Sequence, residues 1–111
     1  MTGLNEVLLM GNMTRDPDVR YTREGRAVCT FGLALHRWFR TREGEDHEET
    51  CFVDVEAFGP LAETCGRYGR KGRAVLVEGR LRLKRWEDRR SGREHSKLLV
   101  TGESLQFLDH R

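Results

Sequence analysis

The sequence has 111 residues, of which 37% are hydrophobic and 34% are charged, and its formal net charge is +2. This length suits one domain with one modest core, so we expect residues 1–111 to fold as a single unit. No apolar run approaches the roughly 20 residues that span a bilayer, and the N-terminus lacks signal-peptide features, so we expect a cytoplasmic protein.

The chain opens with segments whose patterning predicts strands separated by turns. Glu6–Met13 is apolar, with a bend expected at Gly11, and the following Asp-Pro-Asp sequence ends it because proline donates no ladder hydrogen bond. Val19–Tyr21 and Arg26–Leu35 flank a four-residue turn that ends in glycine, which predicts a hairpin. Alternation in the second of these segments points five side chains inward: Ala27, Cys29, Phe31, Leu33 and Leu35.

The middle of the chain combines a charged loop with a clearly alternating strand. Arg40–Glu49 is too charged for a core element, so we expect a protruding hairpin or loop with Gly44 near its tip. The next strand is Thr50–Phe58, and its small apolar side is expected to join the core: Cys51, Val53, Val55 and Ala57. Its other side mixes two rings with two acids, which a buried face would not tolerate. We therefore expect a wet surface there, formed by Phe52, Asp54, Glu56 and Phe58.

The second half begins with the predicted helix, Pro60–Tyr68, because proline is acceptable in a first helical turn. Arg73–Trp86 predicts a strand interrupted at Gly79, and Glu87–Glu94 predicts a second charged hairpin. The last strand and its continuation are expected at Ser96–Glu103 and Ser104–Leu108. Beyond the interruption, Leu81 and Leu83 are expected to face inward, and the opposite side carries Arg80, Arg82, Lys84 and Trp86.

The predicted order is three strands, one short helix and two further strands. This order is typical of the OB-fold, a partly open Greek-key barrel whose face and loops bind oligonucleotides or sugars. We therefore expect an all-β, five-stranded OB-fold barrel with one short helix between its third and fourth strands and extended charged hairpins.

Aromatic and basic side chains coincide on strand positions that alternate away from the core. Residues 67–97 hold twelve Lys or Arg against four acids, and on charge alone this region reads equally as a solvated face or as a phosphate-binding surface. Unpaired bases stack on aromatic rings, at about 1–3 kcal/mol each, while cations hold the phosphates. The combination therefore indicates single-stranded DNA binding, with ordinary packing or subunit contact as the alternative role of each ring.

The residues that we expect to bind DNA form two sets. The expected stacking residues are Trp38, Phe52, Phe58 and Trp86. The expected phosphate contacts are Arg20, Arg37, Arg70, Lys71, Arg80, Arg82, Lys84 and Arg85.

Cysteine and histidine positions give no sign of a metal site or of a catalytic centre. Cys29, Cys51 and Cys65 are odd in number and lack CxxC spacing, so we expect free buried thiols, and the four histidines are scattered. No phosphate-loop, dinucleotide-binding or zinc-protease motif occurs. We expect neither enzyme activity nor a metal or other cofactor.

Several motifs, in order along the chain, resemble the bacterial single-stranded DNA-binding protein family. LNEVLLMGNMTRDPDVRYTREGRAVCTFGLAL (residues 4–35) resembles the family's opening, where a first strand ending in GN precedes a DPxVRYxxxGxxV segment. The likeness continues through FVDVEAFGPLAE (52–63) and RKGRAVLVEGRLRLKRWED (70–88) to the final strand, and so covers essentially the whole chain. It implies stacking at the four aromatics named above, with Phe52 standing where some members have tryptophan.

The resemblance also implies a homotetramer with single-stranded DNA wrapped around it, acting in DNA replication, recombination and repair at the bacterial nucleoid. Members usually add a flexible Gly/Pro/Gln-rich tail whose acidic, hydrophobic tip recruits other proteins. The sequence stops at LQFLDHR, just past the predicted barrel, so we expect tail-mediated recruitment to be missing. Either the tail was removed or the chain is a short paralogue.

The main alternative function is a protein-interaction module of the primosome type that binds nucleic acid incidentally. Such a module needs a basic surface but fewer stacking rings, so the four aromatics argue against it. A cold-shock-type RNA-binding barrel is also disfavoured, because its clustered aromatic run on adjacent strands is missing.

Overall fold

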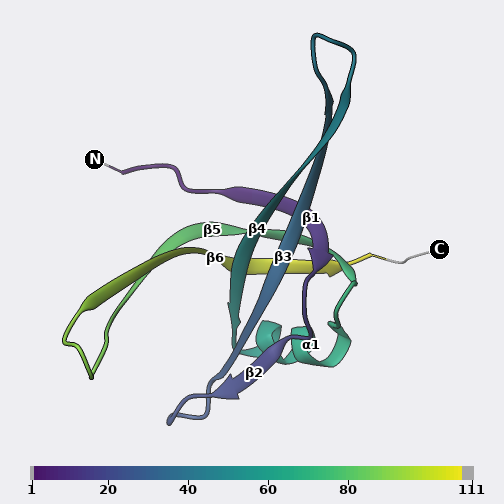
Figure 1. The fold of residues 1–111 in the computed structure, drawn as a ribbon. Helices are drawn as coiled ribbons and strands as arrows, with labels where there is room; N and C mark the ends of the chain where they lie inside the picture. Colours follow the sequence, from purple (N-terminus) through teal and green to yellow (C-terminus); the bar gives the residue numbers. More distant parts are fainter. Residues whose placement is uncertain (1, 109–111) are drawn as a thin grey trace.

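A computed structural model describes residues 2–108, in which six strands and one helix follow one another along the chain (Figure 1). The elements are β1 (Val7–Met13), β2 (Asp18–Tyr21), β3 (Ala27–Arg40), β4 (Asp46–Phe58), α1 (Pro60–Tyr68), β5 (Ala74–Glu87) and β6 (Glu94–Phe107).

The strands close into a barrel in the order β1-β5-β6-β4-β3-β2. β1 pairs antiparallel with β5 and reaches β3 at Met13, which closes the barrel. β4 and β6 run parallel over two residue pairs, Val55 with Val100 and Glu56 with Thr101. β2 is a short extra strand on the outer edge of β3. The prediction of an OB-fold barrel of five strands with one short helix is therefore confirmed.

Alternate side chains from all five barrel strands fill the interior. The largest fully buried side chains are Phe31, Met13, Leu33, Val55, Val75, Val77, Val100, Cys29 and Cys65. Fully burying a large apolar side chain contributes about 1.5–3 kcal/mol, so this cluster supplies most of the driving force for closing the barrel. The predicted inward side of β3 is confirmed, although Leu35 at its outer end is only half-buried.

The helix α1 lies against the barrel and begins and ends at the predicted residues. Gly59 starts it with φ 65°, a conformation that favours glycine, and its N–H donates to the Ala27 carbonyl at 2.8 Å. At the other end, the Gly69 N–H donates to the Cys65 carbonyl at 2.8 Å. Ala62 and Cys65 are buried against the core, so the apolar face of this short helix fixes its position.

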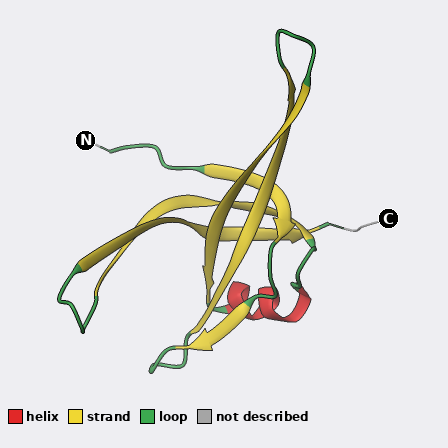
Figure 2. Cartoon of the chain, in the orientation of Figure 1, coloured by secondary structure: helices red, strands yellow, loops and turns green. Residues whose placement is uncertain are grey.

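Two long hairpins, β3–β4 and β5–β6, project from the barrel in different directions (Figure 2). Their loops turn at Gly44 and Gly92, which adopt φ values of 83° and 69°. The radius of gyration is 16.4 Å, above the roughly 13 Å of a compact 100-residue domain, because these arms extend beyond the core. The predicted charged hairpins are confirmed, but their strands extend further than expected. Opposite charges that face each other across the ladder, such as Arg40 and Asp46, accommodate the charged residues in strands.

The prediction that Leu81 and Leu83 face inward is wrong. They are 41% and 48% exposed, although alternation along β5 places them on the same side as the buried Val75 and Val77. β5 leaves the barrel after the register shift at Glu78/Gly79 and continues with β6 as a two-stranded arm. Alternation therefore gave the correct side, but beyond the barrel the described chain covers that side only in part.

The prediction of three buried thiols holds for Cys29 and Cys65 and is wrong for Cys51, which is exposed. Cys51 lies on the predicted side of β4, but at a level where the β3–β4 arm has already left the core. The pKa of the Cys65 thiol is raised well above its ordinary value by its hydrogen bond with Cys29 and by burial. The same hydrogen bond lowers the pKa of the Cys29 thiol. Cys65 is therefore the poor nucleophile of the two, because the thiolate is the reactive form.

Candidate nucleic-acid interface

Trp38, Phe52 and Phe58 lie on one face of the ribbon formed by β3 and β4. Side chains alternate along a strand, and residues directly opposite each other in an antiparallel ladder share a face. Phe52 lies opposite Ala34, Phe58 lies opposite Val28, and Trp38 is four residues beyond Ala34 on the same strand. We call the surface carrying Trp38, Phe52 and Phe58 the aromatic face.

The three rings of the aromatic face differ in their surroundings. Trp38 and Phe52 are 70% and 71% exposed, as expected for rings on a wet surface. Phe58 is half-buried, so the expectation of a wet ring is only partly right. The Arg26 and Arg82 guanidinium carbons lie 4.9 Å and 5.9 Å from its ring centroid, within cation–π range.

The β5–β6 arm turns one of its sides toward the aromatic face. Arg82 Nη1 and Lys84 Nζ each lie 2.9 Å from a carboxylate oxygen of Glu56, which joins β5 to β4. Trp86 is the next residue on this side of β5, 45% exposed. It stacks on His95 of β6, with ring centroids 5.6 Å apart and an interplanar angle of 24°. Trp86, the fourth predicted stacking residue, therefore lies on the same side of the arm as Arg82 and Lys84, which adjoin the aromatic face.

Glu56 and Asp54 are less exposed than we expected from the sequence. Glu56 is 4% exposed, so the prediction of a wet acid at this position is wrong, and Asp54 is half-buried. Both oxygens of Glu56 accept charge-assisted hydrogen bonds, which compensate for its burial. The oxygens of Asp54 face Arg15 Nη1 and Lys97 Nζ. In both groups one carboxylate meets two cations, so the surface between the rings retains positive charge.

The other predicted phosphate-binding cations are spread over several elements. Arg20 lies opposite Val28, which places it on the same face as Phe58, and its Nε pairs with Asp18 at 3.0 Å. Arg80 pairs with Glu103 at 2.9 Å. Arg37 pairs with Glu49 at 3.6 Å and lies on the side of β3 opposite to Trp38.

The last three predicted cations have no carboxylate partner among residues 2–108: Arg70, Lys71 and Arg85. Arg70 and Lys71 lie in the turn between α1 and β5, and the Lys71 backbone N–H donates to Asp16 at 2.8 Å. Arg85 lies beside Trp86 on β5. The structure thus brings Arg82 and Lys84 to the aromatic face and leaves these three elsewhere.

The chain matches the model of the Single-strand binding protein family over residues 4–108. The chain belongs to this family. Proteins described as "Single-stranded DNA-binding protein" from Helicobacter hepaticus and Wolinella succinogenes are 46% and 47% identical to it over 107 residues, or 96% of the chain. The chain spans 62% and 65% of the length of those two relatives. The resemblance found in the sequence is therefore confirmed.

Solved structures of the same family superpose closely. The Plasmodium falciparum SSB complex with ssDNA has a TM-score of 0.87 at 26% identity, covering 98% of both chains. A deletion mutant of the single-stranded DNA binding protein from Thermus aquaticus has a TM-score of 0.86 at 36% identity, covering 98% of this chain and 52% of that one. Both agree with the barrel and helix described above.

Sequence reasoning missed several residues of the interface in this member of the single-strand binding protein family. His95 could have been found by pairing residues across the predicted Glu87–Glu94 hairpin, since it lies directly opposite Trp86. Phe39 and His47 form a similar stacked pair on the other arm, with centroids 5.7 Å apart, but on the side opposite to Trp38 and therefore outside the aromatic face. Lys97 could have been found in the same way as His95, since it lies opposite Lys84, and Arg26 by alternation, since it precedes Val28 by two residues. Arg15 reaches Asp54 from a separate segment and carries no local signal.

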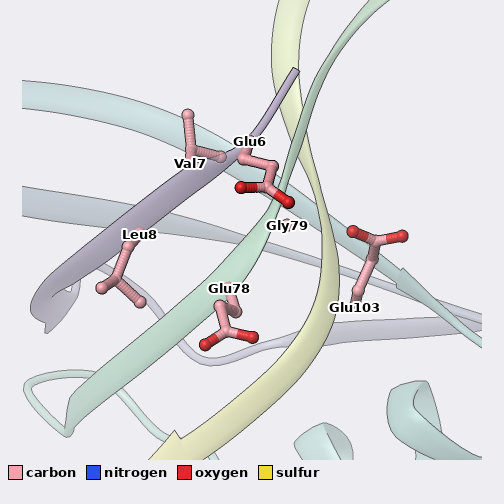
Figure 3. A pocket seen from close by; sticks show the side chains of 6 residues that line it. All are labelled: Glu6, Val7, Leu8, Glu78, Gly79 and Glu103. Atoms are coloured by element: carbon pink, nitrogen blue, oxygen red, sulfur yellow. The ribbon is translucent and has the colours of Figure 1, made fainter. Parts of the chain in front are cut away.

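A separate hollow of about 470 Å³ lies between β1, β5 and β6, away from the four rings (Figure 3). Three carboxylates line it, from Glu6, Glu78 and Glu103, and they would repel phosphate. Within residues 2–108 no group of three metal-ligating side chains converges on a possible metal site, and no helix there is long and apolar enough to cross a membrane. The aromatic face therefore remains the candidate interface.

Proposed function

We propose that this protein binds single-stranded DNA with little dependence on sequence, and protects it during replication, recombination and repair. One observation carries the proposal: exposed rings and cations share a continuous surface, formed by the aromatic face and the adjoining side of β5. The printed names of its relatives support the same ligand. Because the reaction is binding alone, no catalytic residue is needed.

Aromatic rings stack on the bases, and cationic side chains bind the phosphates. The rings of Trp38, Phe52 and Trp86 are exposed enough to receive bases, and each stack contributes about 1–3 kcal/mol. Arg82 and Lys84 use one donor each on Glu56, and a guanidinium carries five N–H donors and an ammonium three. They therefore keep donors for phosphate while Glu56 fixes their positions.

A titration with oligo-dT, followed by tryptophan fluorescence at two salt concentrations, tests this proposal. We expect quenching of Trp38 and Trp86, tight binding of the single strand, and much weaker binding of a duplex of equal length. Equal affinity for both would contradict stacking. Replacing Arg82 by Gln should lessen the slope of log affinity against log salt by about one. The alternative, a protein-interaction module, predicts weak binding without quenching.

The outward side of β1 supports self-association, and we propose that the protein forms a homotetramer. Leu8 and Met10 on β1 are 63% and 65% exposed, and Leu4, just before the strand, is 87% exposed, so together they form an apolar strip. One edge of β1 pairs with β5, but on the other edge the described chain offers partners only at Asn12 and Met13. An open strand edge beside an apolar strip is a template for pairing with another chain.

A further inference from the structure

A groove of about 420 Å³ opens beside Phe52 where β4 and β6 separate. Within residues 2–108 these strands pair at only two positions, and their preceding residues diverge. Phe52 and Leu98 line the groove and are 71% and 59% exposed. It therefore offers a ring for stacking and an apolar wall, next to a polar group.

The polar group is Asp54, which has one cation on each side. Its Oδ1 lies 3.6 Å from Arg15 Nη1, and its Oδ2 accepts a hydrogen bond from Lys97 Nζ. All three residues line the groove. Gly32, directly opposite Asp54 on β3, leaves the space that Arg15 uses, because a Cβ there would lie 2.7 Å from Arg15 Nη1. Arg15, Asp54 and Lys97 therefore form a row of hydrogen-bonding groups in the order donor, acceptor, donor.

We propose that this groove is a nucleobase subsite that prefers the imide edge of thymine or uracil, an inference that rests on the proposed function. The Watson–Crick edge of thymine presents O4, N3–H and O2, which read acceptor, donor, acceptor. Asp54 accepts from N3–H, while Arg15 and Lys97 donate to the two carbonyl oxygens. Phe52 stacks on the face of the same base.

The other bases fit this row less well. Cytosine presents its N4 amine to a cation and its N3 acceptor to the carboxylate, so two of its three groups meet like partners. Guanine places a second donor where the row offers a cation. Stacking strength and strand flexibility alone can give a modest preference between pyrimidines, so reading of the base edge is identified by a preference that disappears when Asp54 loses its charge.

The test compares four labelled oligonucleotides of equal length at neutral pH: oligo-dT, oligo-dU, oligo-dC and oligo-5-methyl-dC. Thymine and 5-methylcytosine share the methyl group and differ in the edge. We expect dT and dU to bind on the order of tenfold more tightly than their cytosine counterparts, the discrimination of one good base-edge contact. Equal affinity for dT and 5-methyl-dC would overturn the subsite alone, whereas failure to bind any of the four would overturn the proposed function as well.

Substitutions assign the preference to this groove. Asp54→Asn should bring the ratio of dT to 5-methyl-dC affinity close to one, and Lys97→Ala should reduce it. Because the ratio is taken within one variant, it does not depend on the fraction that is folded. The control is Glu24→Gln, which removes an exposed carboxylate from the turn between β2 and β3 and should keep the wild-type ratio. An unchanged ratio in Asp54→Asn would overturn the assignment.

Discussion

Phe52 and Phe58 lie on the same face of one strand, but their rings meet different surroundings. Phe52 is 71% exposed, whereas Phe58 lies half-buried beneath two guanidinium groups. A ring open to water is available for a base without rearrangement. A ring already covered by Arg26 and Arg82 contributes to the fold in the absence of DNA, and receives a base only where those cations leave room.

This difference predicts separable effects for two alanine substitutions. Phe52→Ala should weaken single-stranded DNA binding by about 1–3 kcal/mol, because one stack is lost. Its free energy of unfolding should stay within about 0.5 kcal/mol of the wild-type value, as for other surface changes. Phe58→Ala should lower both the affinity and the free energy of unfolding. Urea unfolding and oligo-dT titration of both variants check this. A stability loss in Phe52→Ala as large as in Phe58→Ala would contradict the contrast.

At the scale of elements, Glu56 holds the β5–β6 arm against β4. Its side chain is 6% exposed, while those of Arg82 and Lys84 are 40% and 45% exposed. Beyond this point β5 and β6 pair only with each other in the described chain, so a two-stranded arm depends on this junction for its orientation. Glu56 therefore helps to place the rings on the arm relative to the rings on β4, together with the contact between Asp54 and Lys97.

Replacing Glu56 by Gln should therefore destabilise the protein by about 1–3 kcal/mol. The loss stays below that of a fully buried ion pair because both cations are partly exposed and can be rehydrated. Urea unfolding measures the change in the free energy of unfolding. Glu24→Gln removes the same charge from an exposed turn and should have little effect. Equal effects of the two substitutions would show that Glu56 contributes no more than an ordinary surface charge.

How far the sequence predicts such features depends on how local they are. The bounds of α1 and the inward side of β3 follow from proline, glycine and alternation, which act within a few residues. The burial of Glu56 could not be predicted in this way, because its partners lie 26 and 28 residues away on another strand. The prediction that Leu81 and Leu83 are buried was wrong for a related reason. Alternation determines the side of a strand on which a residue lies, whereas only the tertiary fold determines where the barrel ends.

The same distinction applies to the candidate site. Alternation found the exposed Trp38 and Phe52, because the side of a strand on which a residue lies follows from its neighbours in the sequence. The groove between β4 and β6 was beyond sequence reasoning, since it arises where two strands that are distant in sequence diverge after pairing at two positions. Arg15 and Lys97 become part of it only through that divergence.

At the scale of the whole molecule, two separate surfaces have different chemistry. The aromatic face and β5 present rings and cations, whereas the hollow between β1, β5 and β6 is lined by three carboxylates. Phosphate is therefore attracted to the first surface and repelled from the second. The apolar strip on β1 adjoins the acidic hollow through Leu8, so self-association through β1 would leave the aromatic face of each copy open to DNA.

The substitution Leu8→Lys tests this arrangement. Leu8 is 63% exposed in one chain, so lysine there should leave the fold of the subunit intact. In an assembly built on β1 it would place buried charges at the interface, and light scattering should report a smaller mass than for the wild type. Tyr21→Lys is the matched control, because Tyr21 on β2 is also 63% exposed and lies away from β1. A wild-type mass for Leu8→Lys, or equal dissociation in both variants, would show that β1 does not form the interface.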